Sequence, residues 1–147
     1  MEVSYNWLKE YVSFDLSPER VAQVLTFIGL EVEEIRTVED IPGGLEGVVV
    51  AEVVECAPHP DSDHLNITKV RISEGGELMQ VVCGAPNVAA GQKVLLATVG
   101  TSLPAPDGST VKIKKSKIRG AESYGMICAE DELGIGTSHD GIMVLEP

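Results

Sequence analysis

The feature of this sequence that most constrains the fold is a series of short apolar segments, rich in β-branched residues, that runs from residue 48 to the end of the chain. Gly- and Pro-rich turns separate these segments. Many short strands at this spacing are typical of a small β-barrel, so we predict a mainly β fold. The expected strands are 48–54, 65–72, 78–83, 94–99, 111–118, 125–128 and 142–145. In the second strand we expect Leu65 and Ile67 to point inward and, after a change of phase near Lys69, Val70 and Ile72 as well.

The first forty residues have a helical pattern instead. A short helix is expected to end near Val12, and a second one to follow Ser17, which suits the N-cap, and Pro18, which suits the first helical position. Apolar residues recur through residues 21–28 at the spacing of one helix face. Gly29 is well placed to cap the C-terminus of this helix.

Residues 31–35 (EVEEI) alternate and predict a short, half-exposed strand. The turn-rich stretch 40–44 (DIPGG) then marks the best boundary in the chain. We therefore expect a helical segment over 1–39, an incomplete small domain with too little apolar surface to be stable alone, and a barrel over 40–147. A single acidic helical turn is expected at 130–133 (EDEL).

The composition agrees with a folded protein of the cytoplasm. With 44% hydrophobic residues, a chain of 147 residues has enough apolar surface for a core. The three cysteines form neither a C-x-x-C pair nor an even set, which favours reduced thiols in a cytosolic protein. The N-terminus lacks the pattern of a signal peptide, and the apolar runs are too short to span a bilayer, so we expect no association with membranes.

The distribution of charge is unusual. The formal net charge of -12 argues against a general nucleic-acid binder, which normally has a basic surface. Five of the 11 Lys and Arg residues nevertheless lie within residues 112–119, KIKKSKIR, which we call the basic segment. Only this stretch of the chain is locally basic.

The apolar residues around the basic segment fix its expected geometry. Ile113 and Ile118 are five positions apart, so a regular strand cannot point both inward. A β-bulge near Lys115 or Ser116 would restore the phase. Four cations would then face outward together and could contact phosphates, or else form a solvated strand that resists edge-to-edge aggregation; the spacing leaves both interpretations open. These cations are Lys112, Lys114, Lys117 and Arg119.

The aromatic residues limit the kind of nucleic acid that the barrel could bind. Five of the six lie within the first 27 residues, and only Tyr124 belongs to the expected barrel. Proteins that bind extended single strands stack the bases on several rings. If this barrel binds nucleic acid, it should therefore hold a folded one by its backbone.

No convincing catalytic or metal-binding constellation is present. Pro58 and Pro60 make the stretch around them a rigid turn, in which Asp61 or Asp63 is expected to cap the backbone. A zinc site would need an arranged set of Cys and His ligands, so we do not expect a metal here, although the turn also contains His59 and His64. Cys83 is expected to be a small buried apolar residue rather than a nucleophile.

Four motifs in one order carry a family resemblance. They are HPDSDHL (59–65), QVVCGAPNV (80–88), AGQKV (90–94) and KSKIRGAESYGMICAEDELG (115–134). Together they resemble the tRNA-binding domain family, whose fold is the OB-fold, a five-stranded Greek-key barrel. The chain has His64 where that family usually has Lys, which removes one cation. The segments VSYNWLKEYV and LTFIGLEVEEI at the start resemble the beta-subunit family of bacterial phenylalanine–tRNA ligases.

The resemblance implies a function and its partners. Ligases of that family couple phenylalanine to its tRNA with ATP and magnesium, as α2β2 tetramers. Their aminoacylation site is in the alpha subunit and their editing site in a later domain of the beta subunit. The chain is therefore expected to be the N-terminal part of a beta subunit, with no catalytic site, cofactor or metal of its own, and to serve as an auxiliary tRNA-binding module.

The resemblance also suggests which residues contact tRNA. The outward cations would hold phosphates, and Lys115 and Ser123 would assist. Met126 would pack against a ribose or base, and Asn87 would contact the ligand. Equally open roles are barrel closure for Ser123 and Met126, and tying down its own loop for Asn87. The competing hypothesis is a structural module that packs against other synthetase domains; a stand-alone tRNA-binding dimer is disfavoured by the N-terminal segment.

Overall fold

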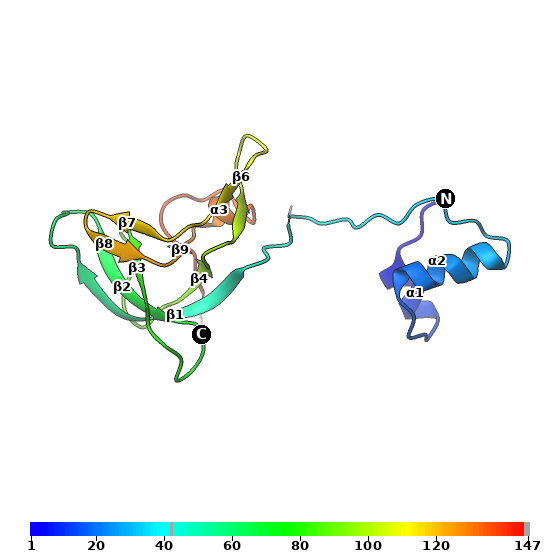
Figure 1. The fold of residues 1–147 in the computed structure, drawn as a ribbon, viewed down its shortest axis with the longest axis horizontal. Helices are drawn as coiled ribbons and strands as arrows, with labels where there is room; N and C mark the ends of the chain where they lie inside the picture. The colour runs from blue at the N-terminus through cyan, green and yellow to red at the C-terminus, as the bar shows by residue number, and fades with distance from the viewer. Residues whose placement is uncertain (42, 146–147) are drawn as a thin grey trace. The chain divides into compact units, whose positions relative to one another are not determined.

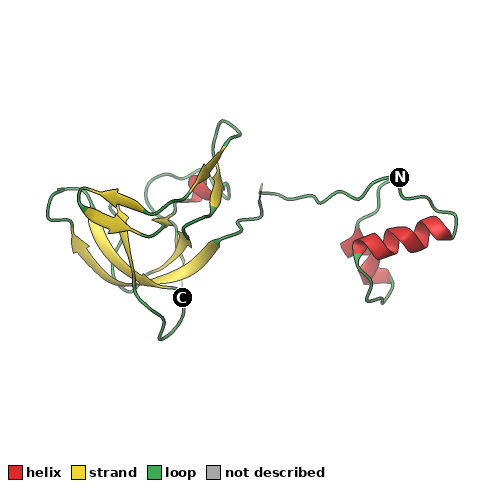
Figure 2. Ribbon diagram, in the orientation of Figure 1, coloured by secondary structure: helices red, strands yellow, loops and turns green. Residues whose placement is uncertain are grey.

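The computed structural model describes residues 1–41 and 43–145, which divide into two compact units, Met1–Val38 and Glu39–Pro147. Helices dominate the first unit and strands the second (Figure 2). Within the described residues, no helix combines the length and the apolar character that crossing a bilayer would require.

The first unit contains the two expected helices. Helix α1 covers Tyr5–Tyr11, and α2 covers Pro18–Phe27. The hydroxyl of Ser17 accepts a hydrogen bond from the backbone N–H of Arg20 at 3.3 Å, as an N-cap should. Gly29 follows the helix with a φ of +102°, a backbone conformation that residues other than glycine rarely adopt.

The expected strand at 31–35 is wrong. These residues have no regular secondary structure, because the first unit offers no second strand with which they could pair. Neither helix of this unit contains a buried residue, and large apolar side chains such as Trp7 and Phe27 are exposed. The described part of this unit therefore has no closed core of its own.

The second unit is a barrel-like array of short antiparallel strands with one helical turn (Figure 1). The strands that form its main sheet are β1 (Val48–Pro58), β2 (Asn66–Arg71), β3 (Met79–Cys83), β4 (Lys93–Ala97), β9 (Met126–Ile127) and β10 (Val144–Leu145). Two hairpins complete the wall, β5 (Ser102–Pro104) with β6 (Thr110–Lys112), and β7 (Ser116–Ile118) with β8 (Ala121–Ser123). Helix α3 spans Glu130–Leu133, as expected.

The topology confirms a mainly β fold and is consistent with an OB-fold. The main sheet has the order β10-β4-β1-β2-β3, and β9 also pairs with β4. Strand β1 is long and curved, and it pairs with β4 along its first half and with β2 along its second half. One strand can thus serve both sides of the barrel (Figure 1). The barrel wall has more strands than the five of the OB-fold that the family resemblance implies, because turns interrupt the wall between β5 and β9.

The bulge that bends β1 lies between Val53 and Glu55, opposite Lys69. The change of phase that was expected near Lys69 therefore occurs on β1, the partner strand, whereas the side chains of β2 alternate regularly between the two faces. Thr68 and Val70 are the residues of β2 that point into the core. The inward orientation expected for Val70 is confirmed, whereas that expected for Leu65 and Ile67 is wrong for this reason, and Ile72 is exposed.

Two apolar clusters fill the barrel. The larger one is built from the inward residues of β1 to β4, including Val53, Val70, Val81 and Val94, each with no exposed surface. The smaller one contains Leu103, Ile113, Cys128 and Leu133 with Ala97. Burying a side chain of this size contributes about 1.5–3 kcal/mol, so these clusters are the main source of stability.

Strand β8 closes the barrel against β3 through individual hydrogen bonds. The backbone N–H of Tyr124 donates to the backbone carbonyl of Gln80 at 2.9 Å. The side-chain amide of Gln80 in turn donates to the backbone carbonyl of Glu122 at 2.9 Å. The chain then turns at Gly125, where φ is +130° and an added Cβ would lie 2.7 Å from the Ala97 carbonyl oxygen. Only glycine fits this approach, which fixes the β7–β8 hairpin on the barrel wall.

Candidate nucleic-acid interface

The basic segment does not form the single bulged strand that its sequence predicts. It begins in β6, leaves regular structure at residues 113–115, and enters β7, which belongs to a different two-stranded sheet. Ile113 is buried in the smaller core cluster, and its N–H donates to the carbonyl of Thr101 at 2.7 Å. Both isoleucines are accommodated because the strand ends between them, so no bulge is needed.

The five cations of the basic segment are all exposed, whereas an outward orientation was expected for four of them, without Lys115. They lie on two hairpins rather than on one strand: Lys112 is on β6, whereas Lys117 is on β7. Figure 1 shows β6 well apart from the β7–β8 hairpin on the barrel. The cations therefore follow the path of the chain between the hairpins and do not form the compact row that a single strand would give.

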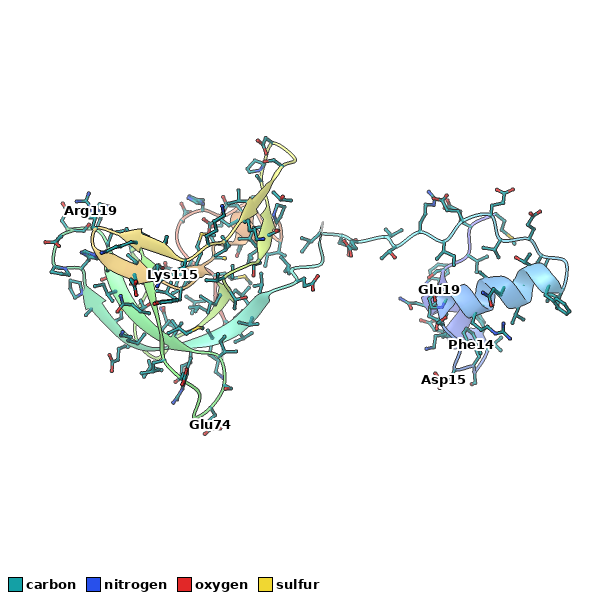
Figure 3. All side chains as sticks on the ribbon, in the orientation of Figure 1. Phe14, Asp15, Glu19, Glu74, Lys115 and Arg119 are labelled. Carbon is teal, nitrogen blue, oxygen red and sulfur yellow. The ribbon has the colours of Figure 1, made fainter. Side chains whose placement is uncertain are left out.

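Arg119 occupies the tip of the β7–β8 hairpin (Figure 3). Ile118 pairs with Ala121, so the loop has two residues, Arg119 and Gly120, with φ values of +47° and +87°. Positive φ at both positions is the mark of a type I′ turn, which matches the twist of a hairpin. Arg119 thus adopts a conformation that is uncommon for a residue with a side chain, and its guanidinium donates to the carbonyl of Asp61 at 3.3 Å.

The loop that contains His59 holds the turn end of this hairpin. His59 is buried, and its Nδ1 accepts a hydrogen bond from the N–H of Asp61 at 3.0 Å. Its Nε2 must then carry the ring proton, and it donates to the carbonyl of Ile118 at 3.2 Å. The turn is therefore capped by the imidazole, and the expected cap by Asp61 or Asp63 is wrong. Among the described residues, no group of three or more potential ligands is placed to hold a metal ion.

Lys115, Glu122 and Tyr124 form a cluster on the same hairpin. The Lys115 ammonium is 3.0 Å from a carboxylate oxygen of Glu122 and 4.7 Å from the centre of the Tyr124 ring. The Tyr124 hydroxyl donates to the other carboxylate oxygen at 2.7 Å. The Tyr124 hydrogen bond and then Lys115 lower the pKa of Glu122, while Tyr124 and Glu122 raise the pKa of Lys115. Both shifts favour the charged forms of the ion pair at neutral pH.

A shallow groove borders this cluster. It runs between the start of β3, which contributes Gln80, and the end of the β7–β8 hairpin, which contributes Glu122 and the following Tyr124. Lys69 lines it from β2, with its ammonium 2.9 Å from the side-chain oxygen of Gln80. Polar side chains thus form much of the lining of the groove, and its lining cation, Lys69, already has an acceptor within the protein.

Three residues that the resemblance suggested for tRNA contact are engaged in the barrel itself. Ser123 is buried, and its hydroxyl accepts from the N–H of Val82 at 3.0 Å and donates to the carbonyl of Gly125 at 3.1 Å. The Asn87 amide donates to the carbonyl of Ile142 at 2.9 Å and accepts from its N–H at 3.0 Å. Met126 pairs with β4 and packs on the smaller core cluster. This geometry favours the structural alternative for each of them.

The buried cysteines are unsuited to nucleophilic chemistry. Burial raises the pKa of the Cys128 thiol to about 12 and also raises the pKa of Cys83. A thiol that stays protonated at neutral pH is a poor nucleophile, because the thiolate is the reactive form. Cys83 lies in the larger core cluster, in agreement with the expected apolar role.

Sequence reasoning did not single out Glu122 and Gln80, which contact the basic segment and its hairpin. A usable signal was present, since Arg119-Gly120 at the centre of a two-residue turn places Lys117 opposite Glu122. The bond from Gln80 to the Glu122 carbonyl joins residues 42 positions apart and had no local signal.

Comparison with known proteins supplies a family for the barrel. Residues 48–147 match the family described as "Putative tRNA binding domain". The match covers more than half of the chain and includes every strand of the second unit.

Similar proteins of several bacteria match almost the whole chain. A protein of Bacteroides fragilis named phenylalanine–tRNA ligase beta subunit is 64% identical over 145 residues, which are 99% of this chain and 17% of that protein. Proteins of the same name from Porphyromonas gingivalis and Geobacter metallireducens are 54% and 50% identical, again over 99% of this chain and over 18% and 17% of their own lengths. The chain therefore spans about a sixth of the length of the curated relatives it matches.

Proposed function

The chain belongs to the tRNA-binding domain family, and we propose that its barrel binds folded tRNA as an auxiliary module, through phosphate contacts with the basic segment. The observation that carries this proposal is the exposure of five cations within residues 112–119 of a chain whose net charge is -12. Exposed Lys and Arg side chains bind phosphates without reading sequence, which suits a module that supports recognition elsewhere.

The residues in the proposed contact fall into two groups. Lys112, Lys114, Lys117 and Arg119 would hold phosphates directly, because their side chains are exposed. Lys115 would assist, but its ammonium already pairs with a carboxylate. We propose supporting roles for Ser123, Asn87 and Met126, which would position the hairpin and the loops on the barrel; their bonds and contacts within the barrel support this.

The names of the similar proteins suggest a larger context. We propose that the chain is the N-terminal part of a phenylalanine–tRNA ligase beta subunit, with residues 1–39 as an incomplete small domain and residues 40–147 as the tRNA-binding barrel. The complete enzyme would attach phenylalanine to its tRNA with ATP and magnesium, in an α2β2 assembly with the alpha subunit. Residues 1–147 would contribute no catalytic group to it. The place of action would be the cytoplasm.

A second function is supported by the charge and by the internal bonds. The barrel could instead be a structural module that packs against other parts of the synthetase and contacts tRNA little. Its single aromatic residue, Tyr124, is covered on one face by Lys115, and the chain as a whole has a net charge of -12. The two functions differ in whether the isolated chain has any affinity for tRNA.

The test is to measure binding of the 147-residue chain to labelled folded tRNA by fluorescence anisotropy, at about 20 mM and about 150 mM salt, with a single-stranded RNA of equal length as the control. Few phosphates would be neutralised, so we expect weak binding that prefers folded tRNA and weakens with salt. Absence of binding even at the lower salt would favour the structural module.

A further inference from the structure

One cation of the basic segment differs from the other four. Among the described residues, Lys115 is the member of this segment with a carboxylate within ion-pair distance, 3.0 Å away on Glu122. The Tyr124 hydroxyl orients that carboxylate through a hydrogen bond of 2.7 Å, and the backbone of Glu122 is held by the amide of Gln80. The carboxylate is therefore oriented by Tyr124 and Lys115, and its backbone by Gln80.

Glu122 also lies beside a second cation. It pairs directly across the hairpin with Lys117, and the side chains of such a cross-strand pair project from the same face of the two strands. A phosphate that approached this hairpin would meet a fixed negative charge between two cations. The carboxylate has the same sign and the same acceptor atoms as a phosphate, so the two would compete for the Lys115 ammonium.

We propose that Glu122 is a built-in competitor for phosphate, a residue that limits the affinity of the β7–β8 hairpin by occupying Lys115 until an RNA phosphate displaces it. This inference rests on the proposed function, because it concerns the same surface and the same ligand. If Lys115 stays paired with Glu122, the five exposed cations of this segment would act as about four toward RNA. Binding would also require a phosphate close enough to Lys115 to displace the Glu122 carboxylate, which disfavours RNA that does not bring a phosphate to this position.

The test compares Glu122→Gln with Glu74→Gln in the 147-residue chain, using anisotropy with folded tRNA over a series of salt concentrations. Both changes raise the net charge by one unit, and both glutamates are exposed. Figure 3 shows Glu74 on the barrel unit at the end away from Lys115 and Arg119. The control therefore measures the effect of net charge alone. The glutamine at 122 still accepts from Tyr124, so the hairpin is expected to keep its fold, which a thermal melt checks.

We expect Glu122→Gln to tighten tRNA binding by about threefold to tenfold and to steepen the slope of log affinity against log salt by nearly one unit, while Glu74→Gln changes affinity by less than about twofold. In a Lys115→Ala background, the gain from Glu122→Gln should be largely abolished, because the freed cation is absent.

The outcomes separate this inference from the proposed function. Salt-sensitive tRNA binding by the unchanged chain with equal effects of the two glutamate variants would overturn the competitor role alone. Binding by none of the proteins at low salt would overturn both. Tight binding by Glu122→Gln where the unchanged chain binds poorly would support the competitor role in its strongest form.

Discussion

At the scale of the residue, two serines that look alike in the sequence have different environments in the barrel. Ser116 and Ser123 are cross-strand partners on the β7–β8 hairpin, yet Ser116 is exposed and Ser123 is buried. The buried hydroxyl satisfies one backbone donor and one backbone acceptor, so its role is to join β8 to β3. A residue suggested for ligand contact by its position in a motif thus has a structural reason to be there.

We predict that Ser123→Ala lowers the free energy of unfolding by about 1–3 kcal/mol, because the N–H of Val82 loses its buried partner. Urea denaturation followed by circular dichroism measures this. The matched control is Ser116→Ala, which should change stability by less than about 0.5 kcal/mol because that side chain is exposed. Equal effects of the two variants would contradict the bridging role, and so would a loss of tRNA affinity by folded Ser123→Ala without a loss of stability.

At the scale of the element, the barrel strands and helices were predicted where a periodic pattern was strong. Ser17 and Pro18 marked the start of α2 correctly, and the apolar segments located β1, β3 and β4. The break in the basic segment was not predicted, because a bulge and a strand end both restore the phase between Ile113 and Ile118. Which of them occurs depends on the smaller core cluster, which holds Ile113 and is assembled from distant parts of the chain.

The candidate site was predictable in part. The exposure of the five cations follows from their charge, but their division between two hairpins follows from topology. Burial of His59 with both ring nitrogens bonded to the backbone could not be foreseen, since one partner, Ile118, is 59 positions away. Residues 31–35 show the opposite case: their alternation predicted a strand, but they form none because no neighbouring strand among the described residues pairs with them.

The turn at the tip of the β7–β8 hairpin gives a prediction that separates stability from binding. Asn is favoured at the first position of a type I′ turn, whereas Arg119 is held there with a φ of +47°. We expect Arg119→Asn to leave the free energy of unfolding within about 0.5 kcal/mol of its original value, or to raise it, and to weaken tRNA binding by about twofold to fivefold at low salt.

The measurements are urea denaturation and anisotropy on the same preparations. Arg119→Lys is the control, because it keeps the charge without the better turn residue, and it should retain most of the affinity. Unchanged tRNA affinity in a folded Arg119→Asn variant would remove Arg119 from the proposed contact.

At the scale of the whole molecule, a net charge of -12 is combined with a basic segment that holds five of the 11 Lys and Arg residues. The net charge of -12 repels RNA at long range, and the basic segment offers a short stretch where a phosphate backbone meets cations. Such an arrangement favours weak, oriented binding over general affinity for nucleic acid. The acidic surroundings and Glu122 would then act in the same direction, by limiting how strongly and where RNA can be held.

The most direct test of tRNA binding by the basic segment is the salt dependence of a variant in which Lys112, Lys114, Lys117 and Arg119 are replaced by Gln, Gln, Gln and Asn. A control variant with Lys9, Arg20, Arg36 and Lys93 replaced by Gln removes the same charge outside the basic segment. We predict that the slope of log affinity against log salt becomes shallower by about 0.7–0.9 for each phosphate that the first variant no longer neutralises and stays near its original value in the control. An unchanged slope in the first variant would contradict the proposed role of the basic segment, because tRNA would then be bound elsewhere on the chain.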